Sequence, residues 1–557
     1  MSRYLSPTLH GKLTETISQF GDNEQQVVAE VPEKRKCTNV SFLIAFSVCF
    51  LVVIPFSIIC SMGSDINRFF YGYDKYGNTC GVKNKPIAGI NCSGQDMTEK
   101  PIALLRYCSI NRYCIFSKKR IVPDQCIESC NPPNQLLFHR CYPAEDVDLD
   151  NYSSNFKQMT EILHVISKSA STILAMSLSA LVLSFTIFFC LRCHTAVTFW
   201  SILIMQLIVS ITATAYFWHK YAMDEDKSVL YILSAVGAMA YVIFLILFIL
   251  ILRENLTLVF GIYEEALNAI FKMPMILLQP ILTLSTLLTL ITSIIFLILL
   301  ICSNECLQQT KQNSFSYANV PNVTALLYSG YLAFLILWIF AFVEGCLAMV
   351  VSGAVSRYYF TSDKLILQRP LRTSFYILTR YHLGTVAYGS LVVTLFLFMR
   401  SIAVYMMRKV YIQTAIHGEA FCKSSIRAFR LLCLNLVHTI TISAFNYIIT
   451  YGFSFLVVIL TVGVGMWMNL VSFSSSSQEN SFTYYARMGI LFGAGCAGAV
   501  AIFVIRVLNI ATETTFFCFC EEQLANDGNT NPTYMTPELV KIIRRAKELR
   551  RIRLTEN

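Results

Sequence analysis

Long apolar segments constrain the fold of this chain more than any other feature of its sequence. Nine of them reach about 20 residues or more, the length that a helix needs to cross the hydrocarbon core of a bilayer. They are residues 40–62, 170–191, 195–217, 229–252, 276–302, 325–351, 383–407, 445–471 and 488–511. Only 14% of the residues are charged, which excludes an ordinary soluble protein, a disordered chain and a coiled coil. The pattern predicts an all-α polytopic membrane protein.

Basic residues set the expected orientation of these segments. Lys34, Arg35 and Lys36 stand directly before the first segment, and no cation closely follows it. Because cytoplasmic loops are enriched in Lys and Arg, we expect the amino terminus in the cytoplasm. The expected division is then a cytoplasmic tail over 1–38, a first transmembrane helix over 39–62, an extracellular cysteine-rich loop over 63–168, a transmembrane core over 169–511 and a basic cytoplasmic tail over 512–557.

Residues 380–444 are the region whose path the sequence leaves open. Counting crossings from both ends puts both sides of this region in the cytoplasm, so the region crosses an even number of times. It holds one strong apolar segment, 383–407, and a weaker one, 431–444, with basic residues between them. Either two helices cross with a basic external turn, or one or both are re-entrant, which requires that protein buries the backbone. The expected total is about ten transmembrane helices.

The loop over 63–168 contains seven cysteines, a density typical of a small disulfide-linked domain in an oxidising compartment. Because seven is odd, one thiol is either free or pairs elsewhere, and the connectivity stays open. Two further cysteines, in a second external loop, are expected to pair with each other. The candidates for disulfides are Cys80, Cys92, Cys108, Cys114, Cys126, Cys130, Cys141, Cys302 and Cys306. The N-x-S/T tripeptide predicts glycosylation on the same side, at Asn91, Asn151 and Asn322.

Five motifs, in order along the chain, resemble those of one family. They are YGYDKYGNTCG (71–81), YEEALNAIFKMPMILLQP (263–280), YHLGTVAYGS (381–390), AIHGEAFCKSSIRAF (415–429), and FFCFCEEQLANDG (516–528) followed by YMTPEL. Together they resemble the choline transporter-like family of solute carriers. One departure is SGAVSRYYF (352–360), where that family has AGAVA-x-WYF.

The resemblance implies a ten-helix carrier for choline or a related amine such as ethanolamine, in the plasma membrane or, alternatively, an organelle membrane. Such a carrier moves its substrate down the electrochemical gradient or in exchange for protons, by alternating access. The implied partners are the small cationic amine and the lipid bilayer, without a cofactor. Two other classes compete with this hypothesis: a cell-surface structural or adhesion protein that acts through the extracellular loop, and a channel.

A quaternary ammonium cannot donate hydrogen bonds, so its binding site needs aromatic faces, and an acid would strengthen it. Glu344 is an acid well within a predicted span, and a carboxylate in a membrane marks a functional site by default. Trp338 and Tyr331 precede it by two and four helical turns. We therefore predict substrate binding by Glu344, Trp338 and Tyr331. The alternative is a structural ion pair, for which Arg400 is the candidate partner.

Signatures of other functions are missing from the sequence. It contains no phosphate-binding loop, no H-E-x-x-H and no G-x-S-x-G, so no enzyme activity is expected. Cys126, Cys130 and His139 could imitate a zinc site, but disulfides are expected outside the cell, and we predict no metal. The surplus of Lys+Arg over Asp+Glu, 44 against 34, is accounted for by cytoplasmic loops and does not require nucleic acid.

Overall fold

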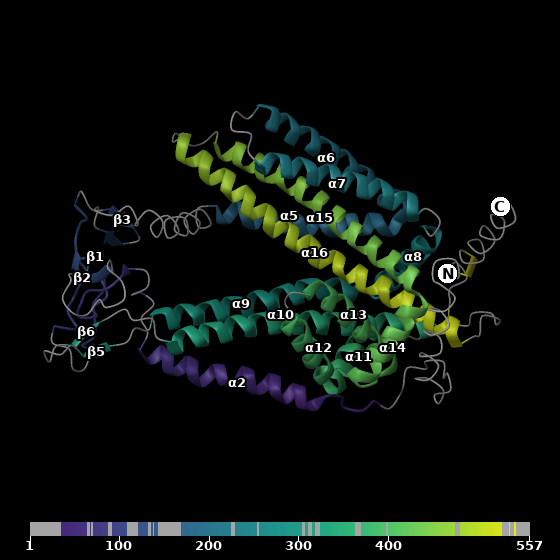
Figure 1. Cartoon of the computed structure of the whole chain (residues 1–557), viewed down its shortest axis with the longest axis horizontal. Helices are drawn as coiled ribbons and strands as arrows, with labels where there is room; N and C mark the ends of the chain where they lie inside the picture. The colour runs from purple at the N-terminus through teal and green to yellow at the C-terminus, as the bar shows by residue number, and fades with distance from the viewer. Residues whose placement is uncertain are drawn as a thin grey trace. The chain divides into compact units, whose positions relative to one another are not determined.

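The structure, a computed structural model, consists mainly of long helices (Figure 1). It describes residues 35–63, 67, 71–86, 92–107, 121–131, 135–137, 139–142, 169–223, 229–252, 256–303, 307–309, 315–317, 323–361, 369–396, 399–473, 479–525, 534 and 540–541. The chain divides into two compact units. The core unit comprises Met1–Ile44, Ser171–Leu284 and Ala341–Asn557, and the loop unit comprises Ala45–Ala170 and Ser285–Phe340.

Seven helices in the described part of the chain are long and apolar enough to cross a membrane. These spans are Ala170–Cys193, Thr195–Met223, Val229–Leu250, Pro274–Leu297, Gly330–Phe360, Leu436–Leu470 and Arg487–Leu524. A further helix, α2 (Val40–Gly63), carries the shorter apolar segment Val40–Pro55. The predicted all-α polytopic membrane fold is therefore confirmed.

The core unit is built around antiparallel helix pairs. The elements are α5 (Ala170–Cys193), α6 (Thr195–Met223), α7 (Val229–Leu252), α8 (Leu256–Lys272), η1 (Pro274–Leu278), α15 (Leu436–Phe473) and α16 (Glu479–Ala525). In Figure 1, α15 and α16 lie side by side along most of their length, and α6 and α7 form a second pair. α16 runs beyond the expected end of the last span at residue 511, and Thr512 to Phe517 are buried.

The apolar segment 383–407 is not one helix. After α11 (Pro370–Ile377) and one π-helical turn, η2 (Leu378–His382), the chain forms α12 (Leu383–Leu395), breaks, and continues as α13 (Arg400–His417) and α14 (Phe421–Leu434). At 13 residues α12 is about 20 Å long, short of the roughly 30 Å of a bilayer core. Since α12 and α13 are not among the spans found in the described residues, this geometry fits the re-entrant alternative for residues 380–444.

The N-terminal strap, Arg35–Asn39, belongs to the core unit although it lies at the end of the expected tail. The Thr38 backbone N–H donates to the Tyr381 carbonyl at 3.0 Å, and its hydroxyl lies 2.8 Å from that of Thr385. The Asn39 side chain accepts a hydrogen bond from the Phe421 N–H, which begins α14. α14 has no side-chain cap within its own segment. The strap thus connects motif residues 381–390 with motif residues 415–429.

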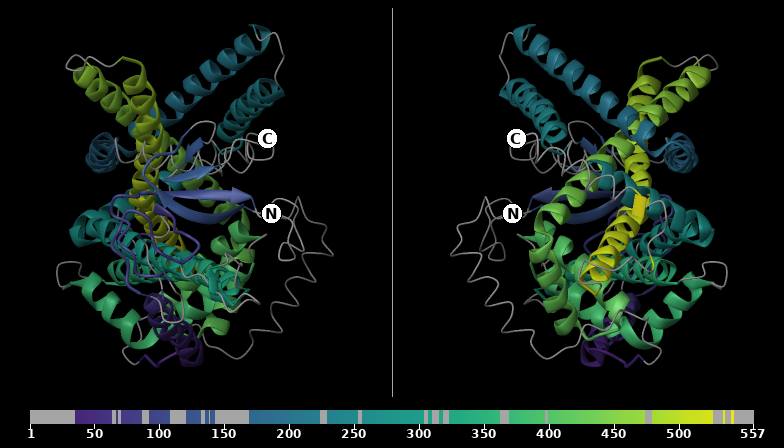
Figure 2. Two further views of the ribbon diagram at one scale, coloured as in Figure 1. Left: turned by 90° about the vertical axis from the view of Figure 1, so that its left-hand side faces the viewer. Right: turned by 90° about the vertical axis from the view of Figure 1, so that its right-hand side faces the viewer.

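The loop unit contains the cysteine-rich region. A four-stranded sheet has the order β2-β1-β4-β3, from β1 (Ile102–Tyr107), β2 (Ile121–Ile127), β3 (Gln135–Leu137) and β4 (Arg140–Tyr142), and its strands are the blue arrows in Figure 2. β1 pairs antiparallel with β2 and parallel with β4. A separate hairpin joins β5 (Leu307–Gln309) and β6 (Phe315–Tyr317). Parts of α2, α9 (Gln279–Ser303) and α10 (Val323–Phe360) complete this unit.

Two disulfides confirm the cross-linked character of this region. Cys80 pairs with Cys126, and Cys130 pairs with Cys141. Cys92 was also a candidate, but it is a free, exposed thiol in a turn. The other candidates, Cys108, Cys114, Cys302 and Cys306, and the predicted glycosylation sites Asn91, Asn151 and Asn322, lie outside the residues whose side chains the structure describes.

The motif YGYDKYGNTCG forms a turn held by two of its own side chains. The Asp74 carboxylate accepts hydrogen bonds from the Tyr76 N–H, the Asn78 N–H and the Asn78 side chain, at 2.8–2.9 Å. The Asn78 amide in turn bonds the backbone of Cys92 and Gly94. Gly72 has a φ of +79°, and a Cβ there would lie 2.7 Å from the Ala103 side chain, so both conformation and space require glycine. The motif side chains in this region therefore stabilise the conformation of the backbone.

Candidate functional site

Glu344, the predicted binding carboxylate, lies on the core-unit part of α10. It forms an ion pair with Arg506 of α16, and both side chains are largely buried. The partner is Arg506 and not the expected Arg400, because α16 and not α13 supplies the base that faces this position. Gly345, the next residue, allows close packing, since a Cβ there would lie 2.7 Å from Val386. The buried carboxylate is thus charge-compensated by the protein itself.

Trp338 and Tyr331 lie on the loop-unit part of the same helix. The Trp338 ring meets Phe46 edge to face, with centroids 5.1 Å apart, and also contacts Phe334. The Tyr331 hydroxyl donates to the Cys49 carbonyl. Along the helix axis these residues are about 9 and 20 Å from Glu344, at 1.5 Å per residue. The structure therefore places the three predicted residues on one helix without gathering their side chains.

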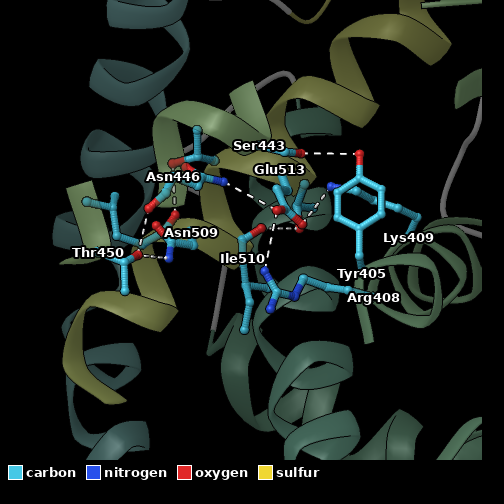
Figure 3. Close-up of polar contacts among 12 residues, drawn as sticks. Tyr405, Arg408, Lys409, Ser443, Asn446, Thr450, Asn509, Ile510 and Glu513 are labelled. Carbon is cyan, nitrogen blue, oxygen red and sulfur yellow. Dashed lines mark hydrogen bonds and ion pairs between the residues drawn. The ribbon is translucent and has the colours of Figure 1, made fainter. Parts of the chain in front are cut away.

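A second buried acid, Glu513 on α16, stands at the centre of a larger polar cluster (Figure 3). Its Oε2 lies 2.8 Å from the Lys409 Nζ, and its Oε1 lies 3.4 Å from the Arg408 Nη1. The side-chain N–H of Asn446 donates to Oε1 at 3.3 Å. The side chains of Lys409 and Glu513 are 1% and 3% exposed. Three helices, α13, α15 and α16, thus bring one acid and two bases together in the interior.

Aromatic rings complete the surroundings of the Lys409 ammonium. Its Nζ lies 4.8 Å from the centroid of the Tyr405 ring and 5.5 Å from that of Phe517. Both distances are within the range in which a cation is attracted to a ring face. A carboxylate with two ring faces is also the chemistry that recognises an amine ligand. Here the ammonium group that occupies this environment belongs to the chain itself.

The polar cluster extends from Glu513 towards α8 and along α15. The hydroxyl of the fully buried Tyr263 donates to the Asn446 side-chain oxygen. Asn509 donates to Thr450 at 2.7 Å, and Ser443 donates to the Tyr405 hydroxyl at 3.3 Å (Figure 3). Polar groups without partners are costly in a membrane interior, so a connected set of this size holds its helices in one arrangement.

Sequence reasoning missed Glu513 because it ended the last span at residue 511, two positions before this acid, whereas the span reaches Leu524. The signal was present: α16 continues without a break through ATETTFFCFC, a segment with a single acid among apolar and hydroxyl side chains. Lys409 was grouped with the basic residues between two apolar segments, although it is buried. Among the described residues no group of three His, Cys, Asp or Glu side chains gathers as a metal site would.

Membrane-length helices that bury paired acids and bases place the chain in the class of functional polytopic membrane proteins, which includes the carriers. A family model described as "Plasma-membrane choline transporter" matches residues 236–410 and 403–524, more than half of the chain. The chain therefore belongs to the plasma-membrane choline transporter family. The matched region includes Glu344, Arg506, Lys409 and Glu513.

Curated relatives extend this similarity over nearly the whole chain. The human choline transporter-like protein 3 is 25% identical, with 94% of this chain and 93% of the relative covered. The choline transporter-like protein 1 of Torpedo marmorata is 24% identical, over 90% of this chain and 91% of the relative. The choline transporter-like protein 2 of Dictyostelium discoideum is 23% identical, over 92% and 95%. The predicted family resemblance is confirmed.

Proposed function

We propose that this protein carries choline, or a related small amine such as ethanolamine, across the membrane by alternating access, without catalytic activity. The observation that carries the proposal is the family match over residues 236–524, which spans both buried acids. The names of the relatives point to the same substrate class. The Lys409 environment adds that this fold can hold an ammonium group between a carboxylate and aromatic rings.

Within this proposal Glu344 supplies the carboxylate that attracts the substrate cation. In the structure Arg506 occupies this carboxylate, so the substrate ammonium would reach it by competing with the guanidinium. Such competition makes binding dependent on the conformation of α10 and α16, which is what alternating access requires. Trp338 and Tyr331 are proposed as aromatic contributors, and because both are engaged with neighbours in the loop unit, their role is tested separately.

Uptake of labelled choline tests the proposal in cells that lack their own choline uptake. Wild type, Glu344→Gln, Trp338→Leu and Tyr331→Phe are compared at equal surface amounts, with Glu264→Gln as the matched control because Glu264 is an exposed acid on α8. We expect saturable uptake for wild type and the control, and a loss of at least tenfold in uptake for Glu344→Gln, equivalent to about 1.4 kcal/mol.

Different outcomes separate the parts of the proposal. Saturable uptake that is unchanged in Glu344→Gln would keep the carrier and reject Glu344 as the binding carboxylate. A good surface amount without uptake of choline or ethanolamine would reject the amine carrier and favour an adhesion role for the loop unit. Ion currents above carrier turnover would favour a channel. Varying the external pH distinguishes exchange for protons from facilitated transport, because only the former drives uptake with a proton gradient.

A further inference from the structure

The described residues that line a small cavity in the core unit include two arginines and no acid. Arg35 of the strap and Arg357 of α10 face it, together with Ser374 of α11 and the backbone at Gly353. None of its lining residues is Asp or Glu, and no ion pair of either arginine is found in the part of the chain that the structure describes. The cavity therefore concentrates positive charge in a buried place.

Two polar groups at this cavity have no hydrogen-bond partner among the residues that the structure describes. The Ser374 Oγ is buried, with the residue only 4% exposed, and the Nε of Arg35 is buried as well. The remaining nitrogens of Arg35 are used: Nη2 donates to the Ala415 carbonyl at 2.9 Å, and Nη1 lies 3.4 Å from the Nε2 of His382. Since buried donors are nearly always satisfied, the unpaired N–H and O–H call for an acceptor in the cavity.

The charge of the two arginines points to the kind of acceptor. Burial and, to a smaller extent, the positive charge of Arg357 together lower the pKa of Arg35 to about 10. Two like charges without an acid between them repel each other, and the repulsion is strong where water is scarce. An anion would relieve this repulsion and would also accept hydrogen bonds from the Arg35 Nε–H and the Ser374 O–H. A neutral water would accept these hydrogen bonds without relieving the repulsion.

The size of the cavity selects among anions. It offers about 10 Å³ to a water-sized particle, on the order of the space that one ordered water occupies. At Gly353 a Cβ would lie 3.1 Å from the Ser374 Oγ, so the glycine preserves the space in front of this hydroxyl. Among common anions a monatomic one comes closest to this size, while a phosphate or a carboxylate-bearing ligand would need the walls of the cavity to move much further apart.

We propose that this cavity binds one chloride-sized monovalent anion between Arg35, Arg357 and Ser374. The anion pairs with both guanidinium groups and accepts a hydrogen bond from the Ser374 hydroxyl. Because Arg35 also bonds Ala415, the bound anion fastens the strap to α10, α11 and α13. The site holds no residue assigned to substrate binding, so the inference stands apart from the proposed transport function.

Thermal unfolding of the purified full chain in detergent tests the site without a transport assay. Melting temperatures are measured in sodium chloride and in sodium gluconate at equal ionic strength. For wild type we expect a saturable increase with chloride, about 1 °C for each tenfold rise in concentration above the dissociation constant. Arg357→Gln should lose this dependence and should melt above wild type in gluconate, because the repulsion of Arg35 is gone.

Two further variants and one direct measurement complete the test. Ser374→Ala should weaken the chloride dependence, while Arg372→Gln, which removes an exposed arginine of α11, should keep it. Bromide should give an anomalous scattering peak between Arg35 and Arg357 in crystals of the full chain. Equal wild-type melting temperatures in both salts would mean an ordered water only and would overturn the proposal. A chloride effect that persists in Arg357→Gln would place the anion elsewhere and would overturn it equally.

Discussion

The cysteine-rich region of the loop unit and the helices of the core unit are each stabilised internally, by contacts that join residues at very different separations along the sequence. In the loop unit, Asp74 bonds Asn78 four residues away, and the disulfides join cysteines 46 and 11 residues apart. In the core unit, Arg408 and Glu513 are 105 residues apart, and Arg35 bonds Ala415 across 380. The cysteine-rich region of the loop unit is cross-linked locally, and the core unit depends on pairs that only the finished bundle brings together.

This difference has an energetic side. A disulfide stabilises mainly by restricting the unfolded chain, so its loss is felt in the segment that it closes. A buried ion pair contributes little net stability, but removal of one partner leaves a charge without compensation in a medium that cannot solvate it. Damage to the core unit should therefore spread over several helices, whereas damage to the loop unit should stay local.

The strongest test of this contrast is Glu513→Gln. It leaves Lys409 and Arg408 buried without an anion, so we expect a loss of about 3–5 kcal/mol in stability, visible as a lower melting temperature and reduced surface amount. The double variant Glu513→Gln with Lys409→Met should recover part of this loss, because the buried ammonium is also removed. If the double variant were no better than the single one, charge compensation would not be the reason for the loss.

The matching test in the loop unit replaces Cys80 and Cys126 together by serine. We expect a loss of about 2–4 kcal/mol within the sheet region, since the bridge closes a loop of 46 residues. Hydrogen exchange should rise in β1 and β2, while the helices of the core unit keep their protection. Increased exchange in α15 and α16 of this variant would show that the two units unfold together and would break the comparison.

A smaller effect is expected from Gly384→Ala. A Cβ at this position would lie 2.3 Å from the Asn39 carbonyl oxygen, so α12 and the strap must separate, at a cost of about 1–3 kcal/mol. Gly463→Ala on α15 is the matched control, because no atom lies within 4 Å of its Cβ. Faster proteolysis near residue 35 in Gly384→Ala alone is the expected readout, and equal cleavage in both variants would contradict it.

The smallest effect near neutral pH concerns His382, which contacts Thr38 and Arg35 of the strap. Burial, helped by the charge of Arg35, lowers the pKa of His382 to about 4. Between pH 6.5 and 4 the unfolded chain therefore binds a proton that the folded chain does not, and stability falls as the pH falls through this window, by about 3 kcal/mol at most. His382→Asn should flatten the melting temperature over this window. A wild-type melting temperature independent of pH there would contradict the assignment.

The sequence predicted much of the fold because the rules that decide it are local. Apolar length marks the spans, and cysteine density marks the cross-linked region, which contains Cys80–Cys126 and Cys130–Cys141. A re-entrant path for residues 380–444 was left as one of two alternatives, and the break between α12 and α13 was not predicted, since hydropathy does not show where a helix stops inside protein.

The site was harder to predict because its parts meet only in three dimensions. Glu344 was found from its place in a span, but its partner, Arg506, lies on a helix 162 residues later, and no rule of spacing joins them. Glu513 was missed because the expected span ended at residue 511, although the helix continues through a segment of apolar and hydroxyl residues to Ala525. Aromatic residues such as Trp338 are too numerous in this chain for composition to separate a ligand contact from packing.

The hydrogen bond from Phe421 to Asn39 ties the completion of α14 to a segment that the ribosome makes 382 residues earlier. While later helices are synthesised, Asn39 and Thr38 must stay available until residues 381–421 arrive. A fusion tag placed ahead of residue 35 leaves this order intact. A deletion that reaches past residue 35 would remove strap residues that contact α12 and α14. A circular permutation that moves the strap to the other end would make the strap absent when α12 and α14 assemble.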